Sequence, residues 1–175
     1  MTHPARTLVP AALLAAALAA APARGQTALA PRPAVSVAAG VSQFDLSGTG
    51  TAPVVSARVD YPLGRALIAE GGVAVARPDQ QFGARTTLVV PEVGLQLQYP
   101  ARLAPYVGVG TGAAIDFRGS ENGGTDADLT LSGAAGVRAW VTDRVGLRGE
   151  LRVRGIGRNF AGSTAEWTAG AAIRF

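Results

Sequence analysis

The sequence of 175 residues contains no cysteine and no lysine, and its one histidine is His3. Without cysteine the chain can form no disulfide, thiolate zinc site or redox pair. Charged residues make up 16% of the chain, below the roughly 25% that is usual in soluble domains. The longest uninterrupted apolar run, residues 11–21, is shorter than the roughly 20 residues of a membrane-spanning helix. The length predicts one domain, and the composition excludes a helical membrane protein.

Residues 1–25 have the composition of a cleavable secretory signal peptide. Arg6 supplies the early charge, an Ala/Leu core runs over 8–21, and small residues follow up to Gly25. We predict cleavage after Gly25, which leaves a short lead over 26–33 and one domain over 34–175. Cleavage removes two arginines with His3, so the net charge falls from +4 to +2. We therefore expect no nucleic-acid partner.

From residue 34 onward, apolar side chains recur at alternate positions, which is the period of a β-strand. The alternation is clearest at the end of the chain, where Trp167 and Ile173 share one face and Glu166 and Arg174 share the other. The pattern predicts eight strands, over 34–44, 53–61, 66–76, 87–99, 105–117, 128–141, 145–156 and 164–175.

The connections between these strands alternate in length. Short turns are expected over 62–65, 100–104 and 142–144, whereas the segments 46–52, 77–86, 118–127 and 157–163 are longer and rich in Gly, Ser, Asn and Asp. Short turns at one end and longer loops at the other are typical of a transmembrane β-barrel, and eight is its smallest common strand number. The predicted fold class is all-β: an eight-stranded antiparallel up-and-down transmembrane β-barrel, preceded by a cleavable signal peptide.

The charged residues within the predicted strands carry even numbers and lie opposite the apolar set. An arginine that faces lipid near the bilayer centre costs roughly 2 to 4 kcal/mol, so we expect these side chains inside the barrel. Side chains just fill the interior of an eight-stranded barrel. Six arginines and six acids should therefore pair as an interior charge plug and line no channel. The predicted plug consists of Arg58, Asp60, Glu70, Glu92, Asp116, Arg138, Arg148, Glu150, Arg152, Arg154, Glu166 and Arg174.

Two binding or transport classes stay open at this point. A soluble barrel of lipocalin type would invert the two faces and hold a ligand among its apolar side chains. A minor porin would conduct through its lumen. The width of the lumen discriminates between these classes and a structural barrel, and the balanced interior charge favours the structural barrel.

Catalytic and cofactor chemistry has little support in the sequence. After cleavage no histidine or cysteine remains to activate a hydroxyl or a water molecule, so we predict no enzyme activity. Residues 108–113 match a G-x-G-x-x-A dinucleotide fingerprint by letter, but strand alternation continues where the fingerprint needs a helix. Glu121, Asp126 and Asp128 could hold only a weak calcium ion. We therefore predict no cofactor and no metal site.

Three stretches resemble the small eight-stranded outer-membrane barrels, the group of the OmpA membrane domain and of OmpX-like and opacity-type surface proteins. Residues 105–110 (PYVGVG) resemble a strand opening of this family, and residues 136–150 resemble its penultimate hairpin. The chain end resembles the signal that the outer-membrane assembly machinery reads. The matching positions of that signal are Thr168, Gly170, Ile173 and Phe175.

This resemblance implies a place in the outer membrane of a Gram-negative-type cell, reached through the periplasm. Its implied partners are outer-membrane lipid, lipopolysaccharide and the barrel assembly machinery. The function that we expect is that of a structural or surface-interaction barrel, whose loops contact lipopolysaccharide or a surface protein. Ala139 and Leu151 depart from the aromatic residues that are usual in the family's penultimate hairpin.

Overall fold

The computed structural model describes residues 29, 31–44, 50–77, 86–118, 125–157 and 162–175. The predicted signal peptide over 1–25 lies outside these residues. Among the residues described, no helix has the length and apolar character needed to cross a membrane.

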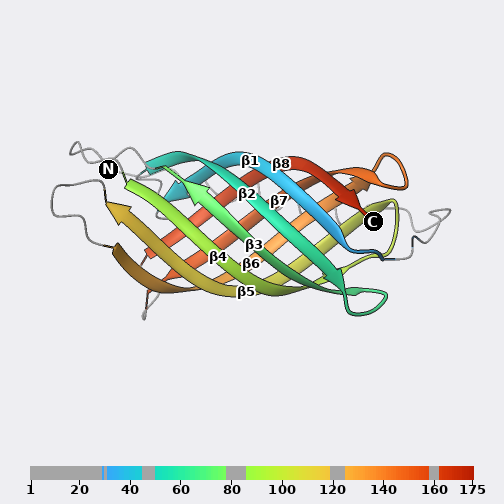
Figure 1. The fold of residues 1–175 in the computed structure, drawn as a ribbon, viewed down its shortest axis with the longest axis horizontal. Coiled ribbons are helices and arrows are strands. Elements are labelled where there is room, and N and C mark those ends of the chain that lie inside the picture. The colour runs from blue at the N-terminus through green and yellow to red at the C-terminus, as the bar shows by residue number, and fades with distance from the viewer. Residues whose placement is uncertain (1–28, 30, 45–49, 78–85, 119–124, 158–161) are drawn as a thin grey trace, which may run out of the picture.

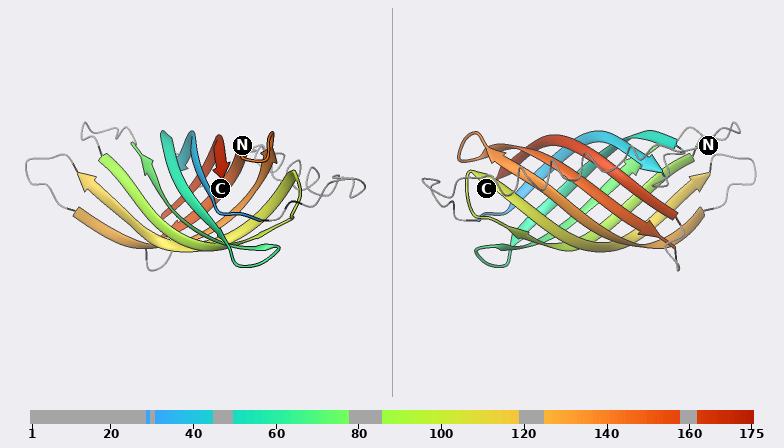
Figure 2. Two further views of the ribbon diagram at one scale, coloured as in Figure 1. Left: turned by 45° about the vertical axis from the view of Figure 1, so that its right-hand side comes forward. Right: turned by 180° about the vertical axis from the view of Figure 1, so that it is seen from behind.

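Eight antiparallel strands form one closed barrel, in which each strand pairs with its neighbours in the chain and the last pairs with the first (Figure 1). The two further views in Figure 2 show the strands tilted around the barrel axis. The strands are β1 (Ala34–Phe44), β2 (Gly50–Pro62), β3 (Leu67–Ala76), β4 (Thr86–Gln98), β5 (Leu103–Arg118), β6 (Thr125–Trp140), β7 (Val145–Ile156) and β8 (Gly162–Arg174).

All eight predicted strands are confirmed, with small shifts at their ends. The largest differences are at β2 and β6, which begin at Gly50 and Thr125, whereas the alternation predicted 53 and 128. The ladder between β5 and β6 continues through Asp116 opposite Asp126 and Phe117 opposite Thr125. Hydrogen-bonded pairing therefore extends past the point where the apolar alternation stops, because a strand outside the bilayer needs no apolar face.

The strand register fixes the dimensions of the barrel. One row of paired residues, followed once around the barrel, returns to β1 ten residues further along, at Phe44 instead of Ala34. The row passes through Ala34, Asp60, Glu70, Gly94, Gly110, Ser132, Arg154, Thr164 and Phe44. Ten residues of about 3.3 Å against eight strand spacings of about 4.8 Å correspond to a tilt of about 40°.

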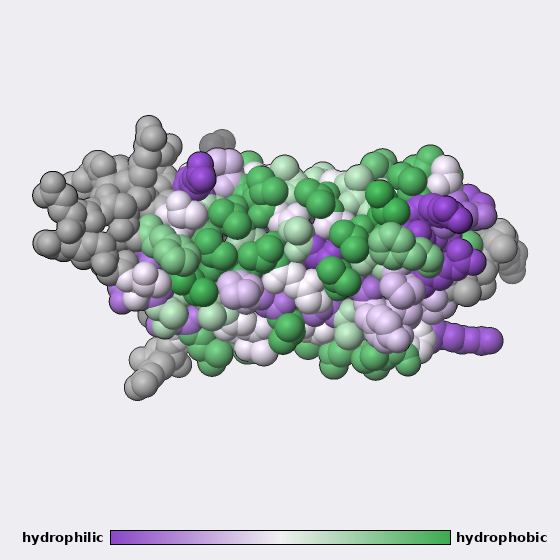
Figure 3. Space-filling model, viewed as in Figure 1, coloured by the Kyte–Doolittle hydropathy of each residue, from purple (hydrophilic) through white to green (hydrophobic). Residues whose placement is uncertain are grey.

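The two faces of the wall have opposite chemistry, as the alternation predicts. Every register pairs even-numbered residues with even-numbered residues, so one parity faces inward throughout the barrel. Val93, Val109 and Leu147 are more than half exposed on the outer wall, whereas Arg138 and Arg154 are almost fully buried inside. Figure 3 shows apolar side chains along the middle of the wall and polar ones gathered at its ends. The inverted faces of a soluble carrier are therefore wrong for this chain.

Candidate functional site in the barrel interior

The centre of the barrel holds two glutamates among three arginines, from β2, β3 and β7. Arg152 places Nη2 at 2.6 Å from Glu70 Oε1 and Nε at 2.9 Å from Glu150 Oε1. Arg148 also contacts both carboxylates, at 2.5 Å for Glu150 Oε2. Arg58 completes the set, at 3.3 Å from Glu70 and 3.6 Å from Glu150. Each glutamate thus faces the same three guanidinium groups.

Further ion pairs extend this centre along the barrel axis in both directions. Toward the short turns, Arg138 Nη2 lies 2.9 Å from Asp60 Oδ2. Toward the long loops, Arg154 Nε lies 3.0 Å from Glu92 Oε2, and Arg154 also pairs with Glu166. We call these ten residues the interior charge network. Its members are Arg58, Asp60, Glu70, Glu92, Arg138, Arg148, Glu150, Arg152, Arg154 and Glu166. Five arginines balance five acids, so the network is formally neutral.

Tyr106 on β5 is part of the same arrangement, although its hydroxyl carries no charge. The hydroxyl donates to Glu150 Oε2 at 2.7 Å and accepts from Arg148 Nε at 2.9 Å. The guanidinium group of Arg138 lies over the ring of Tyr106, 4.9 Å from its centroid. Opposite the ring is Gly136, where an added Cβ would stand 2.5 Å from the Tyr106 hydroxyl oxygen. Glycine is needed there to admit the ring.

The G-x-G-x-x-A stretch is explained by the same packing. It lies within β5, which continues as a strand to Arg118. An added Cβ at Gly110 would lie 2.7 Å from a carboxylate oxygen of Glu92 and 3.0 Å from the hydroxyl of Ser132. Inward glycines here make room for the side chains of the network and form no phosphate-binding turn.

An apolar layer lies inside the barrel on the long-loop side of the network. It consists of Val54, Ala74, Ala76, Val90 and Ala114, with Phe44, Leu88 and Ile156 packed against it. This layer was not predicted, because the alternation assigns the inward face to small and polar residues. The signal was present in two runs, 54–55 and 88–90, where consecutive apolar residues break the alternation. In these runs both faces of the wall are apolar.

The short-turn end of the interior is filled by a second apolar group. Trp140 packs with Ala34, Ala172 and Leu29. Arg174 lies over the Trp140 ring at 4.5 Å and reaches Asp143 at 3.9 Å. The cavity that the structure describes beside these residues measures about 20 Å³, which on this measure is room for about one water molecule.

Two of the twelve residues predicted for the plug lie outside the network. Arg174 is at the short-turn end with Trp140 and Asp143. Asp116 is half-buried at the opposite end, where it lines a hollow of about 310 Å³ together with Asp126 and Asp128. Parity assigns both residues to the inward face but gives no depth along the axis. Asp116 lies near the long-loop end of β5 and Arg174 at the short-turn end of β8, so they are at opposite ends of the barrel.

The described residues include no group of three metal-ligating side chains. Glu121, the third member of the candidate calcium cluster, lies outside the described residues. Of the predicted assembly signal, Ile173 and Phe175 point outward, with 51% and 69% of their surface exposed. Thr168 and Gly170 are half-buried on the inward parity of β8. The backbone N–H of Phe175 donates to the Pro33 carbonyl at 3.0 Å.

An apolar outer wall around a charged interior defines the class of the protein: it is an eight-stranded transmembrane β-barrel. The chain belongs to the outer membrane protein β-barrel domain family, whose sequence model matches residues 10–175. The protein is therefore an outer-membrane protein. No curated protein matches the chain in sequence.

Solved structures of small outer-membrane proteins share this fold at low sequence identity. Neisserial surface protein A (NspA) has a TM-score of 0.72 and 15% identity, over 82% of this chain and 97% of its own. Ail, the attachment invasion locus protein of Yersinia pestis, has a TM-score of 0.58 and 14% identity, over 83% and 100%. The outer membrane enzyme PagL has a TM-score of 0.50 and 13% identity, over 81% and 99%. Because the same fold includes an enzyme, the fold alone does not decide whether this chain is catalytic.

Proposed function

We propose that this protein is a structural and surface-interaction barrel, whose interior is a plug and whose contacts are made by the long loops. The observation that carries the proposal is the filled interior. The neutral charge network occupies the middle of the lumen, and an apolar layer lies across it on the long-loop side. An ion that entered from outside would have to cross apolar side chains and then displace paired guanidinium groups. Both steps oppose conduction.

The balance of charge in the lumen also opposes a role in selective transport. Channels that select ions by side-chain charge line their pores with rings of one charge sign. Here each central carboxylate contacts several guanidinium groups, so little net charge remains to attract an ion. The same pairing leaves none of the five carboxylates of the network placed as a general acid or base, and the predicted mature chain has no histidine. We therefore propose no catalytic role.

The loops then remain as the contact surface. The longer segments carry arginines together with acids, and arginine pairs well with phosphate. We propose lipopolysaccharide phosphates as their first partner and a surface protein as the second. The names of NspA, a surface protein, and Ail, an attachment and invasion locus protein, support a surface role.

Planar-bilayer recording tests the plug. Wild-type protein should give no steady single-channel current, whereas Val54→Gly combined with Val90→Gly and Arg152→Ala should give one, because these changes thin the apolar layer and the network. Val93→Gly combined with Val109→Gly, on the outer wall, is the matched control. Large steady currents from the wild type would contradict the proposal.

A loop replacement tests the contacts. Exchanging residues 120–125 for a Gly/Ser segment should leave the barrel assembled and change its surface binding, and Arg118→Gln at the base of the same loop should reduce binding to immobilised lipopolysaccharide. Unchanged binding, together with hydrolysis of lipid or peptide by the purified barrel, would refute the surface-interaction role.

A further inference from the structure

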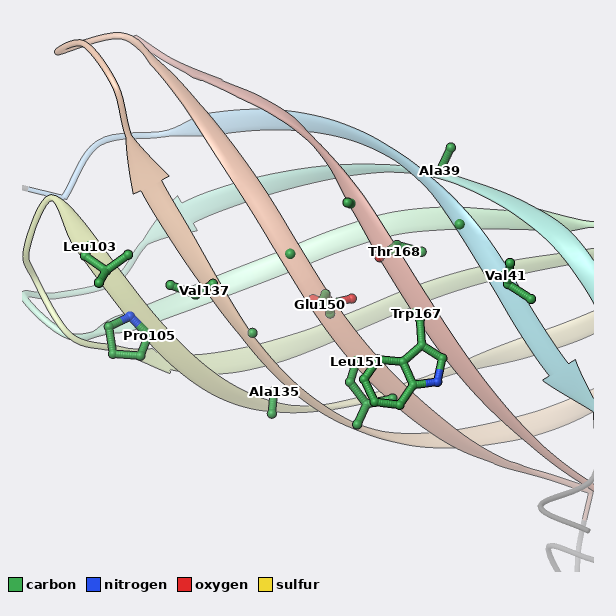
Figure 4. A pocket seen from close by; sticks show the side chains of 14 residues that line it. Ala39, Val41, Leu103, Pro105, Ala135, Val137, Glu150, Leu151, Trp167 and Thr168 are labelled. Atoms are coloured by element: carbon green, nitrogen blue, oxygen red, sulfur yellow. The ribbon is translucent and has the colours of Figure 1, made fainter. Parts of the chain in front are cut away.

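The outer wall has a groove on the side formed by β5, β6, β7, β8 and β1, and its volume is about 610 Å³ (Figure 4). Three of the smallest residues form its floor. Ala39, Ala169 and Gly149 are successive members of one row of paired residues across β1, β8 and β7. The same row continues on the other side into Val55 and Val75. The hollow thus arises because small side chains lie side by side on one wall only.

Larger side chains border this floor. Val41, Trp167 and Leu151 form the next row toward the long loops, and Trp167 and Leu151 lie next to each other in Figure 4. At the other end the groove reaches Leu103 and Pro105, at the start of β5. The groove therefore runs from the middle of the wall to the short-turn end. Short turns face the periplasm in outer-membrane barrels, so this end lies in the periplasmic leaflet.

Filling the groove with hydrocarbon gives packing contacts but little selectivity, because the surrounding lipid tails are equally apolar. A specific occupant needs a polar group at the mouth. Arg102 directly precedes Leu103, and its side chain is 53% exposed. Its Nη2 lies 3.3 Å from Oδ1 of Asp143 on the neighbouring short turn. Arg144 follows Asp143 and is exposed.

The whole short-turn end carries an excess of positive charge. The charged residues described there are Arg32, Arg65, Arg102, Asp143, Arg144 and Arg174. This end holds five arginine side chains and one side-chain carboxylate, of which Arg102 and Arg174 pair with Asp143, whereas the interior is balanced. A guanidinium group forms paired hydrogen bonds to phosphate oxygens, and a phosphate at this depth belongs to a membrane lipid. The charge at the mouth is thus complementary to a phosphodiester.

We propose that the groove and its two neighbouring arginines form a binding site for an anionic glycerophospholipid of the periplasmic leaflet. The phosphate lies between Arg102 and Arg144, and one acyl chain lies along Ala169 and Gly149 toward Trp167. The exposed Asp143 holds Arg102 over the end of the groove until the phosphate arrives. This site is independent of the plug and of the loops.

Lipid retention measured by native mass spectrometry tests the site. The full protein is incubated with phosphatidylglycerol or with phosphatidylcholine of the same chain length. It is then freed from mild-detergent micelles inside the mass spectrometer, and the lipid that stays bound is counted. The wild type should retain one phosphatidylglycerol in preference to phosphatidylcholine. Two changes should reduce that retention about tenfold: Gly149→Leu, which fills the floor, and Arg102→Gln with Arg144→Gln, which removes the charge.

Each change has a matched control on the same barrel. Gly71 also faces outward with open space around its Cβ position, as Gly149 does, but it lies on β3. Gly71→Leu and Arg65→Gln should therefore retain the lipid. Faster gel migration before heating shows that each variant is folded, and Ala169→Leu replaces Gly149→Leu if the latter does not fold.

Four results would overturn the assignment. Equal retention of the two phospholipids would remove the role of the arginines, and equal loss in Gly149→Leu and Gly71→Leu would remove the groove. Displacement of phosphatidylglycerol by lipopolysaccharide would place the occupant in the other leaflet. A dimer that Gly149→Leu dissociates would make the occupant a second copy of this chain.

Discussion

Replacing Glu150 with alanine tests whether the interior charge network is dry and mutually dependent. The carboxylate faces Arg148 at 2.5 Å, Arg152 at 2.9 Å and Arg58 at 3.6 Å, and it accepts from the Tyr106 hydroxyl at 2.7 Å. Its side chain is 2% exposed. Alanine leaves three guanidinium groups around the single carboxylate of Glu70, and the ten-residue network then has a net charge of +1.

Removing one partner of a buried ion pair costs about 3 to 5 kcal/mol, since the other charge stays buried without compensation. We expect Glu150→Ala to reduce the free energy of unfolding by an amount in this range. Urea titration in phospholipid vesicles, followed by tryptophan fluorescence and by migration of unheated samples, measures the change. The slope of free energy against urea should be unchanged if the barrel unfolds as one unit.

Two comparisons make this result specific. Asp143→Ala breaks the Arg102 pair, whose side chains are 53% and 75% exposed, so it should cost about 1 kcal/mol or less. Glu150→Ala combined with Arg152→Met restores neutrality and should be less destabilising than the two single changes added together, by about 1 to 3 kcal/mol. A cost below about 1 kcal/mol for Glu150→Ala would refute the reasoning, because only a hydrated lumen screens the charges so well.

Two further predictions concern packing and assembly. Gly136→Ala places a Cβ 2.5 Å from the Tyr106 ring, so it should reduce the free energy of unfolding by roughly 1 to 3 kcal/mol in the same urea titration. Gly133→Ala is the control, because its added Cβ meets open space and should leave stability unchanged. Equal effects of the two changes would contradict the need for glycine at 136. Deleting Phe175, which is 69% exposed, should prevent outer-membrane assembly in cells but leave refolding of the purified chain into detergent intact. Tyr61→Ala is the control and should assemble. Normal assembly of the deletion variant would refute a terminal signal.

The fold was predictable because the bilayer penalises charge so strongly. Because a charged residue on the lipid face is so unfavourable, the parity of Arg148, Glu150 and Arg152 shows which face of β7 points into the barrel. The short turns then define the up-and-down order of the strands. Strand ends were harder to predict, because β6 begins at Thr125, three residues before the start that its lipid-facing pattern predicts.

Partners within the interior could not be predicted from the sequence. Contact between Arg58 and Glu150 depends on the stagger of all eight strands, which no local pattern specifies. Parity also grouped Asp116 with Arg174, although β5 and β8 end on opposite sides of the barrel. The same stagger aligns Ala39, Ala169 and Gly149, so the outer groove arises from residues that are unremarkable in their own segments.

The ladder between β1 and β8 has a kinetic consequence. It joins eleven positions of the first strand to the last strand. One hydrogen-bonding edge of β1 therefore stays unpaired until the rest of the chain has reached the membrane. Unpaired backbone groups cost several kcal/mol each in hydrocarbon, so a partly inserted sheet with open edges is unstable there. The final seam must therefore close late and cooperatively. Loss of either terminal strand should abolish the inserted state completely, without leaving a stable seven-stranded remnant.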